Sequence, residues 1–166
     1  MAYRVRQATL DDMDTLVHHR VAMFVDMGVE VDEATLAPAF AEWLRREMPA
    51  GSYRAWLVEW TGEDTAGSTR ATPVAGAGAT IIPWPPGPKY PGDRLAFVYN
   101  VYTEPEHRRR GLARVAMDAL HAWCRETGVT SVALNASADG QPLYTALGYS
   151  VTPNPMMFYS LAWERH

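Results

Sequence analysis

Three arginines, Arg108, Arg109 and Arg110, stand in a row directly before Gly111 and an amphipathic stretch. The first turn of a helix leaves about four backbone N–H groups unpaired, and the peptide dipoles add roughly half a positive charge there. Cations at this end destabilise a helix by about 0.3–1 kcal/mol each, so three arginines here indicate a role other than helix stability. Gly111 has no Cβ, which lets an anion approach the backbone closely. The pattern favours a site for a phosphorylated ligand.

Two other interpretations of these residues stay open. A charge run is often only a solvated surface, and clustered arginines also bind nucleic acid. Nucleic acid fits this chain poorly, because its formal net charge is −4 and no basic stripe extends beyond residues 107–114. The run also lacks the Gly-x-x-x-x-Gly-Lys-Ser/Thr spacing of a nucleotide P-loop and the Gly-x-Gly-x-x-Gly spacing of a dinucleotide fold. We therefore expect no nucleic-acid partner.

The bulk composition is that of an ordinary globular protein. The chain has 166 residues, of which 48% are hydrophobic and 20% are charged. Because a domain commonly spans about 100–200 residues, we expect one domain over residues 1–166. The single cysteine, Cys124, cannot form an intramolecular disulfide and fits a reducing compartment. The uncharged stretch 71–88 contains five prolines, which argues against a membrane helix. These features predict a cytoplasmic protein with no membrane partner.

Hydrophobic periodicity and turn residues predict the elements that would hold the arginine run in place. The apolar segment 95–103 suits a central strand buried on both faces, and it leads through a short linker into the helix after Gly111. The order is strand, two helices, three strands, helix, strand, helix and strand, which predicts a mixed α+β fold. The predicted strands span residues 3–8, 53–60, 74–82, 95–103, 130–136 and 156–163, and the predicted helices span residues 9–28, 32–51, 111–126 and a short stretch ending at Gly148.

Residues 108–113 resemble the [Gln/Arg]-x-x-Gly-x-[Gly/Ala] signature of the GNAT superfamily of acyl-CoA-dependent N-acyltransferases. The run follows an apolar strand, FVYNVYT, and the linker EPEH, as it usually does in that family. Downstream, LNASADGQPLYTALGY is similar to the family's strand ending in Asn, short helix carrying Tyr, and Leu-Gly-Tyr/Phe. The order of elements also matches, so the resemblance covers residues 3–163.

The resemblance implies an α+β (mixed α/β) fold of GNAT type. Its centre would be a mixed, mostly antiparallel sheet of six to seven strands with flanking helices. The two central parallel strands would splay apart to admit the cofactor. The implied cofactor is acetyl-CoA (coenzyme A), the implied second substrate is an amine, and a homodimer is possible because dimers are frequent in the family.

The same resemblance implies which residues would bind acetyl-CoA. The pyrophosphate would lie on the loop and helix start, at Arg108, Arg109, Arg110, Gly111, Leu112 and Ala113, with Arg114 beside them. The pantetheine arm would take main-chain bonds from Val101, Tyr102 and Thr103, and Asn135 would reach it from the other side. The N–H of Val101 would also meet the oxyanion of the intermediate. The alternative for Asn135 is a turn residue at the end of a strand.

Tyr144 matches the family's tyrosine that protonates the departing CoA thiolate. A phenol with a pKa near its usual value of about 10 stays protonated at neutral pH and can donate. The alternative is a core tyrosine on a short helix. No metal is expected, because His121 and Cys124 lack a second pair of ligands.

The general base is not evident from the motif. Some family members carry a glutamate early in the central strand, but Phe97 is near that place here. We expect deprotonation through ordered water and backbone carbonyls, or by a group outside the motif. The candidates are Asp26, Glu30, His18, His19 and Glu104.

The acceptor site would be built mostly by the first two helices and by strands. Arg20, Phe24 and Met27 are the substrate-binding candidates, with Arg20 placed to meet a carboxylate. An aromatic and apolar lining predicts a small amine or amino-acid-like acceptor, attacked through a tetrahedral intermediate. Two alternatives stay open: a protein or peptide N-acetyltransferase, and a catalytically silent acyl-CoA-binding sensor module.

Overall fold

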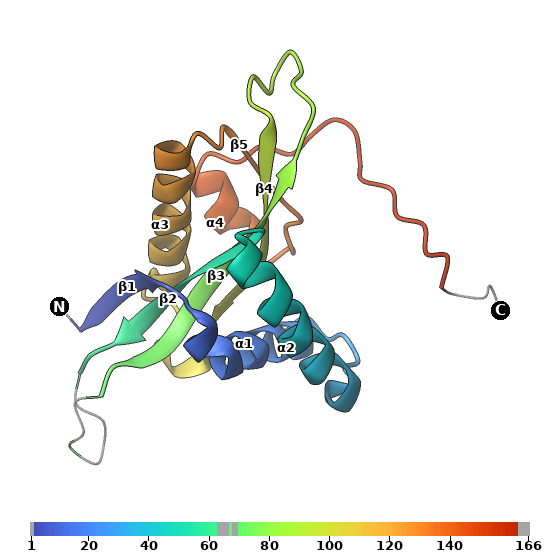
Figure 1. Cartoon of the computed structure of the whole chain (residues 1–166). Coiled ribbons are helices and arrows are strands. Elements are labelled where there is room, and N and C mark those ends of the chain that lie inside the picture. Colours follow the sequence, from blue (N-terminus) through green and yellow to red (C-terminus); the bar gives the residue numbers. More distant parts are fainter. Residues whose placement is uncertain (1, 63–66, 68–69, 163–166) are drawn as a thin grey trace. The chain divides into compact units, whose positions relative to one another are not determined.

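The computed structural model describes residues 2–62, 67 and 70–162. The chain divides into two units, Met1–Asn135 and Ala136–His166, and each is described by itself. The first unit holds the sheet and the long helices (Figure 1). Its elements are β1 (Tyr3–Gln7), η1 (Leu10–Asp12), α1 (Met13–Asp26), α2 (Glu33–Ala50), β2 (Tyr53–Trp60), β3 (Thr72–Pro83), β4 (Arg94–Thr103), η2 (Pro105–His107), α3 (Leu112–Thr127) and β5 (Ser131–Leu134).

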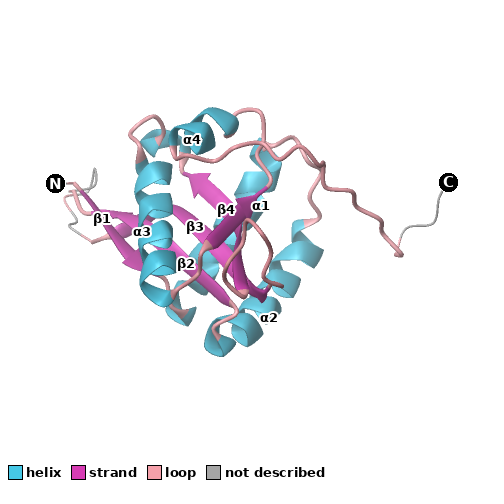
Figure 2. Cartoon of the chain, turned by 90° about the horizontal axis from the view of Figure 1, so that it is seen from above, coloured by secondary structure: helices cyan, strands magenta, loops and turns pink. Residues whose placement is uncertain are grey.

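The strands form one mixed sheet in the order β1-β2-β3-β4-β5. Neighbouring strands from β1 to β4 are antiparallel, and β5 runs parallel to β4. A parallel neighbour requires a crossover, which α3 provides. Figure 2 shows α3 on one side of the sheet and α1 and α2 on the other. This arrangement confirms the predicted α+β class.

Local sequence signals explain where the first helical segment begins. Thr9 caps the segment η1, because its hydroxyl accepts a hydrogen bond from the Asp11 N–H at 3.3 Å. The Asp12 carboxylate in turn accepts from the Thr9 N–H at 2.8 Å, which completes a capping box. The structure therefore confirms the predicted helix start, although its first turn is a separate 3₁₀ segment before α1.

The core of the first unit lies between the sheet and the pair α1 and α2. Leu44, Tyr53 and Leu57 are almost completely buried at its centre. The strand β3 is built from small residues at this point, and Gly78 lies under the Tyr53 ring. A Cβ on Gly78 would come within 2.0 Å of the Tyr53 hydroxyl oxygen, so a larger residue is excluded there. The small side chains of β3 thus make room for a buried tyrosine.

The prediction that β4 is buried on both faces was wrong. Val98, Asn100 and Tyr102 are buried, but Tyr99 between them is 41% exposed. Successive side chains of a strand point to opposite faces. The face carrying Asn100 and Tyr102 packs against α1, through Arg20 and His19. The opposite face is covered less completely at Tyr99.

The strands β4 and β5 separate partway along β4, as the predicted splay requires. Their last paired residues are Val98 and Leu134, whereas β4 continues to Thr103. Before that end, β4 also contains a bulge. Tyr99 pairs with Gly78 of β3 and Tyr102 pairs with Gly76, so two residues of β4 oppose one residue of β3.

The helix α3 confirms the predicted element. Leu112, Ala116 and Leu120 are buried, whereas Val115 is 39% exposed. Met117 and Cys124 are buried as well. The buried positions Leu112, Ala116, Leu120 and Cys124 are therefore spaced four residues apart, and Val115 lies outside this row.

The second unit contains α4 (Gln141–Ala146), with Pro142 in its first turn, where a proline is tolerated. The predicted last strand, residues 156–163, was wrong for the residues that the structure describes, which hold no strand after α4. Trp163 lies outside the described residues. Met157 and Leu161 are each 92% exposed, so their apolar side chains gain no burial from pairing. Across its described residues the chain therefore has five strands, not six to seven.

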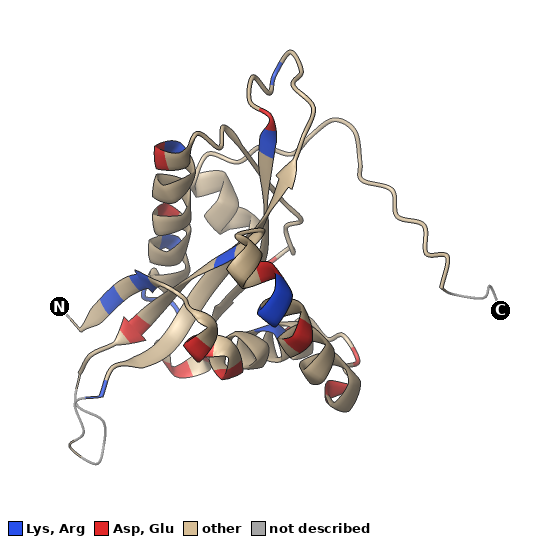
Figure 3. Ribbon diagram, in the orientation of Figure 1, with Lys and Arg blue, Asp and Glu red and all other residues tan. Residues whose placement is uncertain are grey.

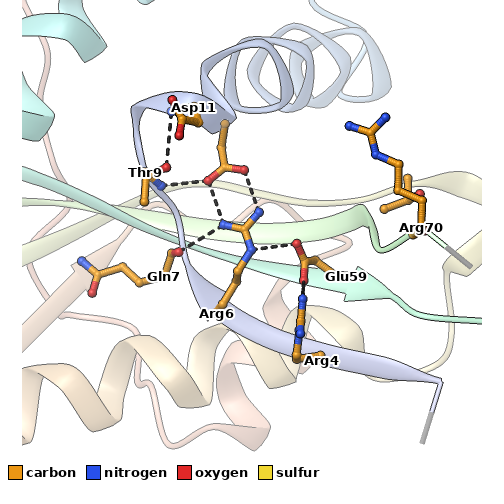
Figure 4. A network of polar contacts seen from close by, with 9 residues as sticks. Arg4, Arg6, Gln7, Thr9, Asp11, Glu59 and Arg70 are labelled. Atoms are coloured by element: carbon orange, nitrogen blue, oxygen red, sulfur yellow. Dashed lines mark hydrogen bonds and ion pairs between the residues drawn. The ribbon is translucent and has the colours of Figure 1, made fainter.

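A polar network ties β1 to β2 and to the start of the helices (Figure 4). The buried Glu59 carboxylate accepts from Arg4 Nη2 at 2.6 Å and from Arg6 Nε at 2.7 Å. Arg6 also donates to both oxygens of Asp12, at 2.8 and 2.7 Å. These bonds from Arg6 lower the pKa of the Asp12 carboxyl. Burial acts to raise the pKa of Glu59, but the bonds from Arg4 and Arg6 outweigh it, and the pKa is lowered.

Replacing Glu59 by glutamine should remove a stabilisation that depends on pH. Because the pKa of folded Glu59 lies below its ordinary 4.5, its stabilisation is present above that value and is lost as the pH falls through the folded pKa. We expect Glu59→Gln to lower the free energy of unfolding by about 1–3 kcal/mol at neutral pH, measured by urea denaturation.

The difference between the variant and the wild type should shrink as the pH falls through the lowered pKa of folded Glu59, where the carboxylate protonates. Glu42→Gln, at an exposed pair with Arg45, is the matched control and should change little. A difference that stays constant with pH would contradict this account of Glu59.

Candidate functional site

The arginine run ends in a loop whose backbone leaves N–H groups available at the start of α3. Gly111 is the N-cap of α3, with a φ of 75°, and among the described residues outside its own segment no atom lies within 4 Å of the position that its Cβ would take. The first bond of the helix runs from the Val115 N–H to the Gly111 oxygen at 3.1 Å. The N–H groups of Leu112, Ala113 and Arg114 therefore have no acceptor within the helix. The helix start presents open space and unpaired donors.

A second left-handed residue shapes the same loop. Arg109 has a φ of 59°, which is uncommon for a residue with a side chain. Turns that include left-handed residues gather successive N–H groups into concavities that bind anions. The side chains of Arg109 and Arg110 are exposed beside this turn. The loop thus combines main-chain donors with two accessible positive charges.

Arg108 has a different role from its two neighbours, because the protein itself binds its guanidinium. Its Nε donates to the Thr103 oxygen at the end of β4 at 2.9 Å. Its Nη2 forms an ion pair with Asp26 at the end of α1. The guanidinium carbon lies 5.7 Å from the centre of the Tyr102 ring. Arg108 therefore joins the loop to β4 and α1, and Asp26 is already paired.

The predicted main-chain ligands lie on the part of β4 that extends past β5. Val101, Tyr102 and Thr103 follow the last β4–β5 pair at Val98. A strand edge without a neighbour offers N–H and C=O groups to an extended ligand. Asn135 directly follows β5 and is exposed. These four predicted residues thus lie at the ends of the two strands that separate.

Three of the five candidates for the general base form a cluster between α1 and the end of β4. His18 Nε2 lies 2.6 Å from Glu104 Oε1, and the Tyr102 hydroxyl donates to Glu104 Oε2 at 3.3 Å. His19 is only 2% exposed, and its Nε2 lies 3.8 Å from Glu104 Oε1 without a hydrogen bond. Burial, aided by the charge of His18, lowers the pKa of His19 to about 4. Glu30, on the α1–α2 loop, lies outside the cluster.

The three candidates for acceptor binding occupy one helix but differ in accessibility. Arg20 lies between the Phe24 and Phe40 rings, with its guanidinium carbon 5.0 and 4.9 Å from their centres. Its Nη1 donates to Asn100 Oδ1 at 2.7 Å. Met27, at the C-cap of α1, is more than half exposed. The guanidinium proposed to meet a carboxylate is thus already bound to an amide oxygen.

Sequence reasoning missed two polar residues beneath this site. Asn100 is buried in β4 and Tyr53 in β2, and Asn100 Nδ2 donates to the Tyr53 hydroxyl at 2.8 Å. The available signal was an amide in the middle of the otherwise apolar segment LAFVYNVYT. A buried amide needs partners, so its occurrence in such a strand indicates a built interaction.

Tyr144 lies in the second unit, on α4. Its side chain is half-buried, and its ring meets the Tyr149 ring edge-on with the centres 5.8 Å apart. Burial raises the pKa of the Tyr144 phenol above its ordinary value. The hydroxyl therefore keeps its proton at neutral pH and is able to donate it.

Charge is distributed unevenly over the elements of the first unit. Figure 3 shows basic residues on β1 and both acidic and basic residues on α2. The basic residues of β1, Arg4 and Arg6, are paired with Glu59 and Asp12. Among the described residues, no helix combines the length and apolarity that crossing a membrane requires.

Solved structures include close matches to the whole chain. A GCN5-related N-acetyltransferase from Ralstonia eutropha JMP134 is 31% identical, with a TM-score of 0.79, covering 95% of this chain and 98% of that one. A predicted acetyltransferase from Clostridium acetobutylicum, solved with acetyl-CoA, has a TM-score of 0.81 over 98% of this chain and 99% of its own. It is 23% identical, which supports the fold alone.

A curated relative matches over a shorter region. Serotonin N-acetyltransferase 2, chloroplastic, from Oryza sativa subsp. japonica is 35% identical over 107 residues, which are 61% of this chain and 48% of the relative. The chain thus spans about half the length of that relative. Residues 18–149 match the model of the acetyltransferase (GNAT) family. This match covers most of the sheet, the arginine loop and α4. The chain therefore belongs to the GNAT acetyltransferase family.

Proposed function

We propose that the chain is an N-acetyltransferase that moves the acetyl group of acetyl-CoA to a primary amine of a small molecule. The observation that carries the proposal is the first unit's combination of an unpaired edge of β4 with the open, donor-rich start of α3. One feature suits an extended arm and the other suits a pyrophosphate. Acetyl-CoA contains both groups.

The acetyl-CoA contacts follow from these two features. The pyrophosphate binds the N–H groups from Gly111 to Arg114, and the exposed charges of Arg109 and Arg110 add to the attraction. Arg108 shapes the loop from its bonds to Thr103 and Asp26. The pantetheine arm lies along residues 101–103 like an added strand, with Asn135 on the other side. Membership of the GNAT acetyltransferase family, matched over residues 18–149, supports this kind of cofactor.

The reaction is a direct transfer between the two substrates. The amine nitrogen attacks the thioester carbonyl carbon, and the carbonyl oxygen gains negative charge in a tetrahedral intermediate. The N–H of Val101 donates to that oxygen. The carbon–sulfur bond then breaks, and Tyr144 gives its proton to the thiolate, which leaves as CoA.

An attacking amine must be neutral, so a base has to take its proton. We assign this role to the His18–Glu104 pair, which the structure holds at 2.6 Å on the side of β4 that faces α1. Asp26 is less suited, because it is paired with Arg108. Proton transfer through an intervening water is compatible with this geometry.

The acceptor class follows from the lining offered by α1. Phe24 provides an aromatic side chain that is partly exposed, and Met27, at the end of α1, adds an exposed apolar side chain. We therefore propose a small primary amine with an apolar part. The relative described as a serotonin N-acetyltransferase supports an aromatic amine. A cytoplasmic location, which the free buried thiol of Cys124 favours, and a homodimer complete the proposal.

The function is tested by acetyl-CoA consumption across a panel of arylalkylamines, amino sugars, amino acids and short peptides. We expect turnover with a small apolar amine, and we expect Tyr144→Phe to lower kcat by about 10–1000-fold with little change in CoA affinity. Tyr149→Phe is the matched control, since it removes a hydroxyl from the neighbouring ring. CoA binding without turnover of any amine would instead favour a silent acyl-CoA-binding module.

A pair of substitutions at Gly111 tests the pyrophosphate site. Asp and Asn have similar shapes and both tolerate a positive φ, and the space around Gly111 is open. Gly111→Asp would place a carboxylate where the phosphates bind, so we expect CoA affinity to fall by about 100-fold or more. Gly111→Asn should lose about tenfold or less by calorimetry. Equal losses would contradict an anion site at this loop.

Removing the Glu104 carboxylate tests the base. Glu104→Gln should lower kcat/KM near neutral pH by about 10–100-fold for an alkylamine with a high pKa. The loss of kcat/KM should be much smaller for an amine that is already neutral at that pH. Glu106→Gln, at an exposed position of η2 two residues further along, is the control. An equal loss for both classes of amine would exclude Glu104 as the base.

A further inference from the structure

The bulge in β4 is located where the proposed reaction takes place. Between the pairs Tyr99–Gly78 and Tyr102–Gly76, the strand β4 has two residues, Asn100 and Val101, opposite a single residue of β3. Asn100 has a φ of 59°. A left-handed residue inside a strand rotates the following peptide plane, and that plane carries the N–H of Val101. The backbone of Asn100 therefore sets the direction of this N–H group.

A left-handed conformation inside a strand needs a reason to persist. Asparagine tolerates it better than most residues with a side chain, but an extended backbone is still the usual state of a strand. The Asn100 side chain is held at both of its polar atoms. Its Oδ1 accepts from Arg20 Nη1 at 2.7 Å, and its Nδ2 donates to the Tyr53 hydroxyl at 2.8 Å.

Each partner of Asn100 is itself fixed by packing. The Tyr53 side chain is completely buried, and its hydroxyl lies over Gly78, where no Cβ would fit. Burial raises the pKa of Tyr53 to about 12, so the hydroxyl stays neutral. Arg20 is stacked between the Phe24 and Phe40 rings, one from α1 and one from α2. The Asn100 amide thus contacts α1 and β2, and its two partners are packed in turn against α2 and β3.

We propose that Arg20 and Tyr53 are positioning residues, which hold Asn100 in its left-handed conformation and so aim the Val101 N–H at the thioester carbonyl. This inference rests on the proposed acetyl transfer. It also gives Arg20 a role other than the predicted contact with an acceptor carboxylate, since its Nη1 already has a partner. The two residues act through Asn100 and touch neither substrate in this account.

The test separates the side-chain bonds from the backbone conformation. Asn100→Gly permits the positive φ but removes both hydrogen bonds. Asn100→Asp retains an acceptor for Arg20 and offers a second oxygen to which the Tyr53 hydroxyl donates. We expect kcat to fall by about 10–100-fold in Asn100→Gly and to stay within about threefold of wild type in Asn100→Asp. The dissociation constant of CoA, from calorimetry, should stay within about threefold in both.

Tyr53→Phe removes one anchor at a distance in the sequence, and Tyr3→Phe is its matched control. The Tyr3→Phe variant also loses a single side-chain hydrogen bond, which joins the Tyr3 hydroxyl to His107 Nδ1 at 3.0 Å, away from the bulge. We expect kcat to fall only in Tyr53→Phe, together with a change in the three-bond HN–Hα coupling of Asn100, which reports its φ. Melting temperatures identify any variant whose loss follows from unfolding.

Two results would overturn the inference. One is a wild-type kcat in Asn100→Gly. The other is an unchanged Asn100 coupling in folded Tyr53→Phe. A wild-type protein that turns over no amine would contradict the proposed function instead. The coupling measurement is independent of turnover and still decides whether Tyr53 holds the bulge.

Discussion

The backbone hydrogen bonds that β4 does not make are the constraint on which the rest of the structure depends. A central strand normally pairs on both sides, yet β4 loses its β5 partner after Val98 and is bulged at Asn100 and Val101. Unpaired main-chain groups at this depth are unfavourable unless water or a ligand satisfies them. The main-chain groups of β4 beyond Val98 are thus available to an extended polar ligand. The first N–H groups of α3 likewise have no acceptor within the helix.

Several polar residues fix the part of β4 that extends past its last pair with β5. Arg108 fastens the end of β4 to α1 and to the loop, through Thr103 and Asp26. Arg20 and Tyr53 bind the bulge through the Asn100 amide. Hydrogen bonds between buried polar groups favour one specific geometry. These interactions therefore fix the backbone of β4 around the point where β5 ends.

Local signals made much of the fold predictable. The capping residues at Thr9 and Asp12, the glycines after the helices and the apolar run of β4 each act within a few residues. They placed nine helices and strands in the right order, and the arginine–glycine loop could be assigned to the start of α3. The last predicted strand failed because a strand's pairing depends on a neighbour that local composition does not specify.

The sequence by itself determined the order of the elements from β1 to α4 and the position of the arginine–glycine loop at the start of a helix, because caps and periodicity are local properties. Only the tertiary structure decided what the individual side chains do. It paired Arg108 with Asp26, joined His18 to Glu104 across 86 positions, and bound Arg20 to Asn100 across 80. Contacts between distant residues depend on how the sheet and helices pack, and no spacing along the chain encodes them.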